Sequence, residues 1–480
     1  MTTQITLSIW IFLLLLAITA WAMLDRVLIP SVRWFLRRRI NRVIDEINTR
    51  LDITIKPMQL TKRQVLIDRL IYDNKVIEAI QAHAGKYGTP REVIQAKVYR
   101  YAREIVPSFN AYIYFRIGYW LAKKVARFLY RVRVDFVDYD SINVTDPNAT
   151  VVFVMNHRSN MDYILVSFLA AERTALSYGV GEWAKIWPLQ SLIKSLGAFF
   201  VRRKSGNPLY RLVLERYIHM ATKEGVCQAV FPEGGLSRDG RLQSPKMGLI
   251  DYMLRSFNPQ TDRDIVFIPV GINYDRTLED RSLLRSLDPH AEKRSKWFVV
   301  RTTIRFVLHN LALMTRSQWQ RFGFACVNFG PSFSAKEYCR RHRIDFRRMT
   351  RNDRFVEVEK LCRHLMYIIN HIVPVIPQPL VAKVFLSAPR KWLSTLDVKA
   401  QVRLLIEDLE SRGVVVNIPE KDREEAINRA LNMMTLRRMI KAKEGRYMLL
   451  PGAEDILSYY AATLQYWFEN PEDRGTSIKS

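Results

Sequence analysis

A histidine and an aspartate stand five residues apart in the stretch MNHRSNMDY, which runs from Met155 to Tyr163. Five residues of α-helix turn through roughly 500° and would leave the two side chains about 140° apart around the axis, so one regular helix would separate them. The preceding apolar run VVFVM predicts a buried strand, and MDYILVSFLAA predicts a helix that begins near Asp162. His157 and Asp162 are therefore expected at a strand-to-helix turn, where α/β sheets commonly place functional groups.

A carboxylate that fixes the orientation of an imidazole allows the other ring nitrogen to act as a base. In α/β hydrolases the base acts on a serine held in a G-x-S-x-G turn, and this sequence contains no such turn. The hydroxyl that His157 activates is therefore expected to belong to a substrate. The pair predicts direct transfer of an acyl or similar group to an alcohol without a covalent enzyme intermediate, for which general-base catalysis contributes roughly 10²–10⁴-fold.

Two further blocks lie at predicted strands. The block GAFFVRRKS places Arg202 and Arg203 directly after a hydrophobic run. Neighbouring side chains of an extended segment face opposite ways, so one arginine can enter a site while the other pairs outside it. The block IPVGINY, from Ile268 to Tyr274, is an apolar strand end that could line the wall of a site for an aliphatic chain.

A glycine-containing block, FPEGGLSRDGRL, follows the predicted strand QAVF. Its Glu233 and Gly234 come first, and glycine allows the backbone to approach a ligand closely and to offer its N–H groups to an anion. Ser237 and Arg238 add a hydroxyl and a planar guanidinium, both suited to a phosphate. This block predicts an anion-binding loop.

These four blocks, in this order, resemble the membrane-associated glycerolipid acyltransferases, and within that superfamily the glycerol-3-phosphate acyltransferases. The most similar stretches are LGAFFVRRKSGNPLYRLVLERYIHMATKEG and FPEGGLSRDGRLQSPKMG, and VNFGPSFSAKEY and ILSYYAATLQYWF are also similar to segments of that family. The resemblance covers roughly residues 108 to 340, and the carboxy-terminal hundred residues more loosely.

The resemblance implies a glycerol-3-phosphate acyltransferase of phospholipid synthesis that produces lysophosphatidic acid. His157 would be the general base on the sn-1 hydroxyl of glycerol 3-phosphate, with Asp162 orienting it. The donor would be a long-chain thioester of coenzyme A or of acyl carrier protein, and no metal or bound cofactor would be required. The phosphate-binding residues implied are Arg202, Arg203, Glu233, Gly234, Ser237, Arg238 and Lys246, and the wall beside the acyl chain would comprise Ile268, Pro269 and Val270.

One position departs from the family pattern. The third block of the family usually has arginine where this chain has Leu236. Loss of one charge-assisted phosphate contact ordinarily costs about 1.5–3 kcal/mol. Lys246 or Arg241 could compensate, and dihydroxyacetone phosphate and a lysophospholipid are the alternative acceptors.

Strands alternating with helices between residues 135 and 335 predict an α/β acyltransferase domain with a central, mostly parallel sheet flanked by helices. The domain is expected over residues 108–376, after an anchor at 1–30 and a basic helical region at 31–107. A mainly helical domain is expected over 377–480, with a small hairpin in AKEGRYMLL. The aromatic and basic stretch Phe109–Val134 predicts a helix that either belongs to the core of the domain or lies among lipid headgroups.

The first 24 residues carry no charge, and Ile5–Leu24 is long and apolar enough to predict a single transmembrane helix. Arginines follow it, which predicts an anchored protein whose remaining chain faces the cytoplasm, as in a bacterial inner membrane. The formal net charge of +27 indicates polyanionic partners such as membrane lipids or phosphorylated substrates. A membrane-anchored nucleic-acid-binding protein is the alternative from another class, but no recognition motif supports it and no nucleic acid is expected.

Overall fold

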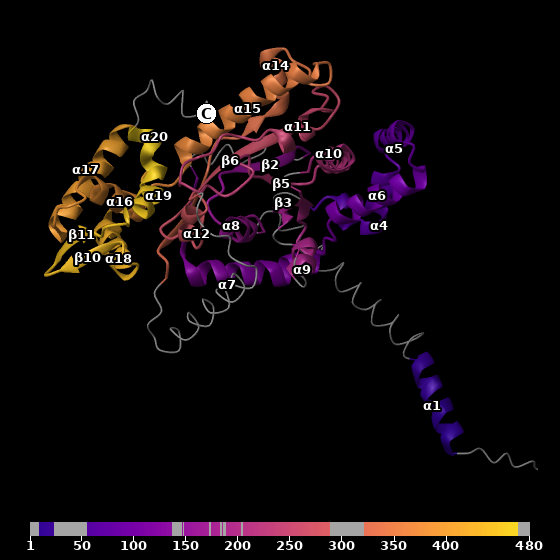
Figure 1. The fold of residues 1–480 in the computed structure, drawn as a ribbon, viewed down its shortest axis with the longest axis horizontal. Helices are drawn as coiled ribbons and strands as arrows, with labels where there is room; N and C mark the ends of the chain where they lie inside the picture. The colour runs from indigo at the N-terminus through magenta and orange to yellow at the C-terminus, as the bar shows by residue number, and fades with distance from the viewer. Residues whose placement is uncertain are drawn as a thin grey trace, which may run out of the picture.

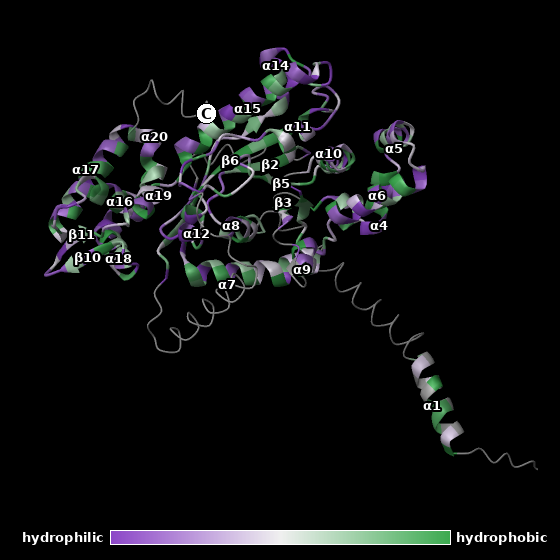
Figure 2. Ribbon diagram, viewed as in Figure 1, coloured by the Kyte–Doolittle hydropathy of each residue, from purple (hydrophilic) through white to green (hydrophobic). Residues whose placement is uncertain are grey.

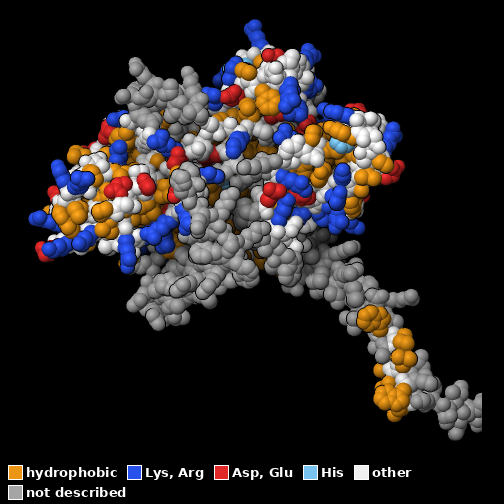
Figure 3. Space-filling view, in the orientation of Figure 1, with side chains coloured by type: hydrophobic (Ala, Val, Ile, Leu, Met, Phe, Trp, Pro, Cys, Tyr) orange, Lys and Arg blue, Asp and Glu red, His pale blue; other side chains and the backbone are white. Residues whose placement is uncertain are grey.

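The computed structural model describes residues 9–23, 55–136, 146, 148–171, 174–182, 185, 189–202, 205–288 and 321–468. A central sheet with helices on both faces lies between a group of amino-terminal helices and a carboxy-terminal helical unit (Figure 1). Hydrophobic residues concentrate in the central strands, while hydrophilic residues lie along the outer helices (Figure 2). Lysine and arginine side chains are spread over both the amino-terminal helices and the carboxy-terminal unit (Figure 3).

The sheet has the strand order β1-β7-β6-β2-β5-β3-β4, with the short strand β8 paired to β6. All pairs are parallel except those of β6 with β7 and with β8. The α/β class with a mostly parallel sheet, predicted from the sequence, is confirmed. The strands are β1 (Arg131–Phe136), β2 (Thr150–Met155), β3 (Ser177–Gly181), β4 (Phe199–Val201), β5 (Gln228–Val230), β6 (Ile265–Tyr274), β7 (Phe324–Phe329) and β8 (Phe333–Ser334).

Strand β2 is buried on both faces, which explains its continuous apolar sequence. Val152 and Val154 pack into one hydrophobic cluster, and Val151, Phe153 and Met155 pack into another. This alternation is the two-residue period of a strand. Helices α10 (Pro208–Lys223), α11 (Gly248–Leu254) and α15 (Arg351–Ile372) contribute to the first cluster, and α7 (Tyr119–Leu129) and α8 (Met161–Ala170) contribute to the second.

The amino-terminal helices share the first cluster with the sheet. Ile94, Val98 and Ala102 recur every four residues along α6 and are fully buried beside α10. The amino-terminal helices therefore pack into the hydrophobic core of the sheet domain and do not form a separate core. They are α3 (Pro57–Leu60), α4 (Arg63–Ile71), α5 (Asn74–Tyr87) and α6 (Arg91–Ile105).

The stretch predicted as one helix over Phe109–Val134 is shorter in the structure. A π-helical segment, η2 (Ile113–Gly118), leads into α7, which ends at Leu129, and the following RVRV begins strand β1. The prediction was wrong over these last residues because their pairing with β7, almost two hundred residues later, decides their conformation. Ile117, Trp120 and Leu121 stay exposed on the outer side of this helical segment.

The carboxy-terminal unit has its own hydrophobic cluster. Its small sheet has the order β10-β11-β9, and its hairpin turns at Glu444 and Gly445, both with positive φ, as a two-residue turn between twisted strands requires. The predicted hairpin is confirmed. The elements are α16 (Pro377–Ser387), β9 (Leu393–Ser394), α17 (Thr395–Ser411), α18 (Arg423–Leu436), β10 (Ile440–Lys443), β11 (Arg446–Leu449), α19 (Glu454–Ala461), η6 (Ala462–Leu464) and α20 (Gln465–Phe468).

Within the described part of the chain, no helix combines the length and apolar character needed to cross a bilayer. Helix α1 covers Ile9–Met23, which is 15 residues of the predicted Ile5–Leu24 span. The rest of that span lies outside the described residues.

Candidate active site

His157 and Asp162 meet at the turn between β2 and α8. The strand ends at Met155 and the helix begins at Met161, so the chain reverses within five residues. His157 Nδ1 lies 2.9 Å from Asp162 Oδ2, and both side chains are almost completely buried. The predicted pair is therefore assembled by the predicted strand-to-helix turn.

Asp162 is the centre of the hydrogen bonds that shape this turn. Its Oδ2 also accepts hydrogen bonds from the backbone N–H groups of Arg158, at 2.7 Å, and Ser159, at 3.0 Å, while its Oδ1 accepts one from the Tyr274 hydroxyl at 2.7 Å. Burial, followed by the charge of Asp162, raises the pKa of Tyr274 well above its usual value, so this phenol remains a donor. A carboxylate can only accept, so His157 Nδ1 carries the hydrogen and Nε2 presents its lone pair.

Two aromatic side chains border the imidazole. The ring of Phe231 stacks on it with 4.1 Å between centroids, and the Tyr163 hydroxyl lies 3.5 Å from Nε2. The side chain of His157 is only 2% exposed. A substrate hydroxyl that reaches Nε2 must therefore take a place beside Tyr163, in surroundings that largely exclude water.

Glu233 ties the FPEGG loop to the histidine turn. Its Oε1 accepts the backbone N–H of His157 at 2.7 Å, and its Oε2 accepts that of Gln243 at 3.0 Å. Burial raises the pKa of the Glu233 carboxyl to about 8, although both amide hydrogen bonds lower it. In the structure this predicted phosphate-site residue supports the backbone of the His157 turn.

Ser237 supports the same loop. Its backbone N–H donates to the His157 carbonyl at 2.9 Å, and its hydroxyl donates to the Arg241 carbonyl at 2.7 Å. Gly234 has φ of +65°, and a Cβ there would lie 2.8 Å from Cδ of Lys246, so the glycine permits this close approach. Lys246 and Arg238 are exposed and remain available to a ligand.

Arg202 follows β4 at the same edge of the sheet, with its guanidinium held by Glu104. Its Nε and Nη2 donate to the two carboxylate oxygens at 2.8 and 2.6 Å. This bidentate contact, of a kind that favours arginine over lysine, occupies one edge of the guanidinium. Arg203 lies outside the described residues.

The predicted acyl-chain wall lies in the centre of the sheet. Ile268, Pro269 and Val270 belong to β6 and are buried, and Ile268 and Val270 pack in the cluster beneath β2. Contact of these residues with an acyl chain remains a prediction.

Two contacts of the turn had no local signal in the sequence. Glu279 accepts hydrogen bonds from the Ser159 hydroxyl at 2.7 Å and from the Asn160 backbone and side chain. The buried guanidinium of Arg158 donates to the Gly240 carbonyl and lies 4.7 Å above the ring of Tyr459, in α19. The carboxy-terminal unit therefore contacts the residue directly after His157.

The described residues contain no group of three or more His, Cys, Asp or Glu side chains that could hold a metal ion. The four cysteines, Cys227, Cys326, Cys339 and Cys362, are buried, free thiols.

Two family models match the chain. The Acyltransferase model matches residues 134–273, and the model of the glycerol-3-phosphate acyltransferase C-terminal region matches residues 309–469. The first of these ranges contains the His157 turn and the FPEGG loop, and the second contains the carboxy-terminal unit.

Proteins named glycerol-3-phosphate acyltransferase are similar over most of the chain. The protein from Xylella fastidiosa (strain M12) is 28% identical over 411 residues, and the match covers 83% of this chain and 46% of that protein. The protein from Pseudomonas entomophila (strain L48) is 29% identical over 437 residues, and the match covers 86% of this chain and 50% of that protein. The chain thus spans about half the length of the curated relatives it matches. A crystal structure of a 1-acyl-sn-glycerophosphate acyltransferase from Thermotoga maritima is 15% identical, with a TM-score of 0.30, and the match covers 64% of this chain and 96% of that protein. The chain therefore carries an acyltransferase domain that contains the His157 turn, followed by a glycerol-3-phosphate acyltransferase C-terminal region, and it is similar to proteins named glycerol-3-phosphate acyltransferase over most of its length.

Proposed function

We propose that the protein transfers a long-chain acyl group from an acyl thioester to the sn-1 hydroxyl of glycerol 3-phosphate and produces lysophosphatidic acid. The observation that carries this proposal is the buried His157–Asp162 pair, with Nδ1 held by the carboxylate and Nε2 directed away from it. The similarity to proteins named glycerol-3-phosphate acyltransferase supports the choice of substrate class. The donor would be a thioester of coenzyme A or of acyl carrier protein.

In this mechanism, Nε2 of His157 accepts the proton of the sn-1 hydroxyl while the oxygen attacks the thioester carbonyl. The carbon–sulfur bond then breaks, and the imidazolium returns the proton to the departing thiolate, so that an ester and a thiol leave the site. Asp162 stabilises the transient imidazolium electrostatically, because the two groups are in contact and nearly excluded from water. No enzyme nucleophile and no metal ion takes part in these steps.

Arg238 and Lys246 are the residues we assign to the acceptor phosphate. Both are exposed and belong to the loop after β5, the strand next to β2, so their side chains can reach a phosphate whose hydroxyl end lies at His157. Arg202 is less available because Glu104 holds it on two sides. These two exposed cations would replace the phosphate contact that the family's arginine makes at the position of Leu236. If the enzyme prefers dihydroxyacetone phosphate or a lysophospholipid as acceptor, they do not replace it.

We further propose that the enzyme works at a membrane surface, where its acyl donor and its product both partition. The segment formed by η2 and α7 exposes Ile117, Trp120 and Leu121, and it carries Lys123 and Lys124 close by. Aromatic and aliphatic side chains next to lysines are typical of a helix that lies in the headgroup layer of an anionic bilayer. The apolar segment that contains α1 would add a second attachment.

The test uses the full-length purified protein, a labelled long-chain acyl-CoA, and glycerol 3-phosphate, dihydroxyacetone phosphate and lysophospholipid as acceptors. We expect glycerol 3-phosphate to be acylated, with His157→Ala slower by at least about 10²-fold. His83→Ala, on helix α5, is the matched control and should keep the wild-type rate. Equal rates for wild type and His157→Ala would refute the mechanism, and acylation of a lysophospholipid alone would refute the proposed acceptor.

A further inference from the structure

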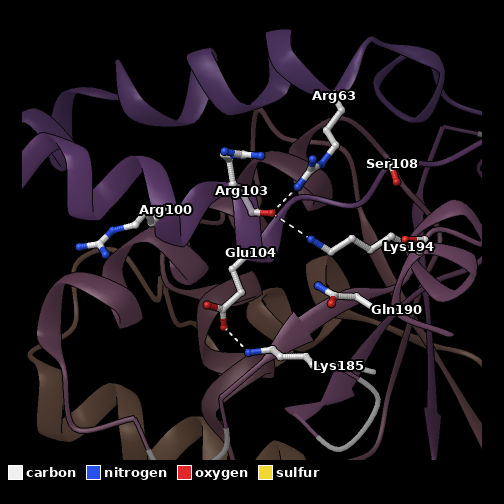
Figure 4. Close-up of a pocket in the computed structure, with 9 residues that line it drawn as sticks. Arg63, Arg100, Arg103, Glu104, Ser108, Lys185, Gln190 and Lys194 are labelled. Carbon is white, nitrogen blue, oxygen red and sulfur yellow. Dashed lines mark hydrogen bonds and ion pairs between the residues drawn. The ribbon is translucent and has the colours of Figure 1, made fainter. Parts of the chain in front are cut away.

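A basic cavity of about 560 Å³ lies between the amino-terminal helices and the edge of the sheet (Figure 4). Its walls come from α4, α6, α9 (Leu189–Ser195) and Lys185. Strand β4 is the last strand of the sheet on this side, and α6 packs against it. The cavity therefore adjoins the outer edge of the sheet, beyond β4.

The lining carries far more positive than negative charge. Five cationic side chains face a single carboxylate, Glu104, which is already bonded to Lys185 at 2.6 Å and to Arg202. Among the described residues, the other four cations have no carboxylate partner; they are Arg63, Arg100, Arg103 and Lys194.

Backbone carbonyls hold two of these cations in place instead. Figure 4 shows Lys194 and Arg63 converging on the carbonyl of Arg103; the lysine contact is 2.9 Å, and Arg63 also donates to the Val106 carbonyl at 3.0 Å. Carbonyl oxygens fix the position of a cation without neutralising it. The cavity thus keeps a net positive charge on side chains that are already oriented, as an anion-binding site requires.

Lys194 shows the energetic cost of this arrangement. The residue is only 8% exposed, and burial together with the neighbouring Arg63 lowers the pKa of its ammonium to about 8, whereas Glu104 alone opposes this. The other charged groups facing it, Lys185 and Arg103, also lower that pKa. A bound anion would remove the repulsion and favour the charged lysine.

The cavity is too far from His157 to hold the phosphate of the acceptor. Strands β2, β5, β3 and β4 are consecutive neighbours, so β4 lies about 14 Å from β2 at the usual spacing of about 4.8 Å. Glycerol 3-phosphate extends roughly 6 Å from its sn-1 oxygen to its phosphorus, at about 1.2 Å per bond of extended chain. The pantetheine arm of coenzyme A extends roughly 15 Å from sulfur to the first phosphorus on the same scale, which matches the separation.

We propose that this cavity is the binding site for the phosphate groups of the acyl donor, the phosphate-bearing end of a coenzyme A thioester. The inference rests on the proposed function, because it places the thioester carbon at His157 and the phosphates beyond β4. It assigns the amino-terminal helices, and Lys194 and Arg103 in particular, to donor recognition. Lys194 and Arg63 both donate to the backbone carbonyl of Arg103, so replacement of the Arg103 side chain keeps these two contacts and removes its cation–π contact with Tyr99.

The experiment compares Lys194→Met and Arg103→Met with Arg91→Met, an exposed position on the same helix as Arg103 and outside the cavity. All are made in the full-length enzyme, and their thermal unfolding is measured first. Each cavity variant should raise the KM for acyl-CoA about 10-fold while leaving the KM for glycerol 3-phosphate unchanged, since loss of one charged phosphate contact costs about tenfold or more. Acyl-pantetheine, a donor without phosphates, should react equally with all variants and wild type.

A second measurement does not depend on catalysis. Desulfo-coenzyme A, which cannot carry an acyl group, should bind the wild type and Arg91→Met, and bind Lys194→Met about 10-fold more weakly. An unchanged KM for acyl-CoA with unchanged desulfo-coenzyme A affinity would overturn the inference, as would a rise only in the KM for glycerol 3-phosphate. Weaker binding to anionic vesicles alone would overturn it in favour of a lipid phosphate. A wild type that binds desulfo-coenzyme A through this cavity but does not acylate glycerol 3-phosphate would refute the proposed acceptor and leave the donor site standing.

Discussion

Replacement of Asp162 by asparagine removes one negative charge and leaves almost every hydrogen bond of the catalytic turn in place. The amide oxygen can occupy the position of Oδ2, where it accepts from His157 Nδ1 and from the N–H groups of Arg158 and Ser159. The amide nitrogen then occupies the position of Oδ1 and donates to the Tyr274 hydroxyl, whose oxygen can accept. The variant should therefore keep the histidine tautomer as well as its orientation.

The expected loss follows from the charge alone. At an effective dielectric constant of about 20, unit charges 2.9 Å apart attract each other by about 6 kcal/mol. If about half of the proton charge has reached the imidazole in the transition state, about 3 kcal/mol of stabilisation is lost, which is about 10²-fold in kcat. The loss should be smaller than the roughly 10⁴-fold that accompanies an inverted tautomer in a serine protease.

Two companion variants separate charge from structure. Asp162→Ala leaves the two backbone N–H groups and the Tyr274 hydroxyl unpaired, at about 1–3 kcal/mol each, so stability and activity should both fall. Tyr274→Phe removes only the Oδ1 contact and should lower the free energy of unfolding by about 1 kcal/mol with little change in kcat. The assay is steady-state acyl transfer alongside urea unfolding. An Asp162→Asn enzyme that folds normally and keeps more than about a third of wild-type kcat would refute the electrostatic role of Asp162.

Three further changes test the support of the turn. In the folded protein the Glu233 carboxyl keeps its proton up to about pH 8, whereas in the unfolded chain it releases the proton near pH 4.5. This group therefore lowers the free energy of unfolding as the pH rises between these two values. In Glu233→Gln, the free energies of unfolding at pH 5 and pH 8 should differ less than they do in wild type. Gly240→Ala would place a Cβ 1.9 Å from the Tyr459 carbonyl oxygen, so this variant should have a lower melting temperature than Gly452→Ala. Gly452 is the control because its φ is similarly positive but no atom lies within 4 Å of its Cβ position. Equal melting temperatures would show that the contact between Gly240 and Tyr459 is not tight. Tyr459→Leu removes the ring beneath Arg158 and should lower kcat several-fold at an unchanged KM for glycerol 3-phosphate, a result that an unaltered kcat would contradict.

The catalytic turn could be predicted from the sequence because its signals are local. A buried apolar strand, a five-residue spacing and a following helix together specify that His157 and Asp162 meet. The hairpin could be predicted for the same reason, because its signal lies in the two turn residues, Glu444 and Gly445, which both adopt positive φ.

The supporting contacts could not be predicted because they join distant parts of the chain. Tyr274 is 112 positions from the aspartate it contacts, and Glu279 is 120 positions from Ser159. Nothing in IPVGINY distinguishes a tyrosine that supports a catalytic carboxylate from one that fills the core. Likewise, Arg202 follows its strand as expected, but its partner Glu104 belongs to helix α6, whose position beside Arg202 no local pattern indicates.

Arg158 connects the carboxy-terminal unit, which has its own core, to the His157 turn. The turn is held by three carboxyl groups, those of the buried Asp162 and Glu233 and of the partly buried Glu279, and desolvation raises the pKa of the last two. The charge of Arg158 opposes this increase at Glu233. Buried charges are tolerated only when they are compensated and shielded from competing water. Tyr459 supplies that shield from α19, with its ring over the guanidinium. Loss of this helix would expose the arginine and weaken its effect on Glu233, whose carboxyl group holds the backbone of the His157 turn. In the proposed mechanism, α19 therefore supports the orientation of the imidazole through Arg158 without approaching the substrate.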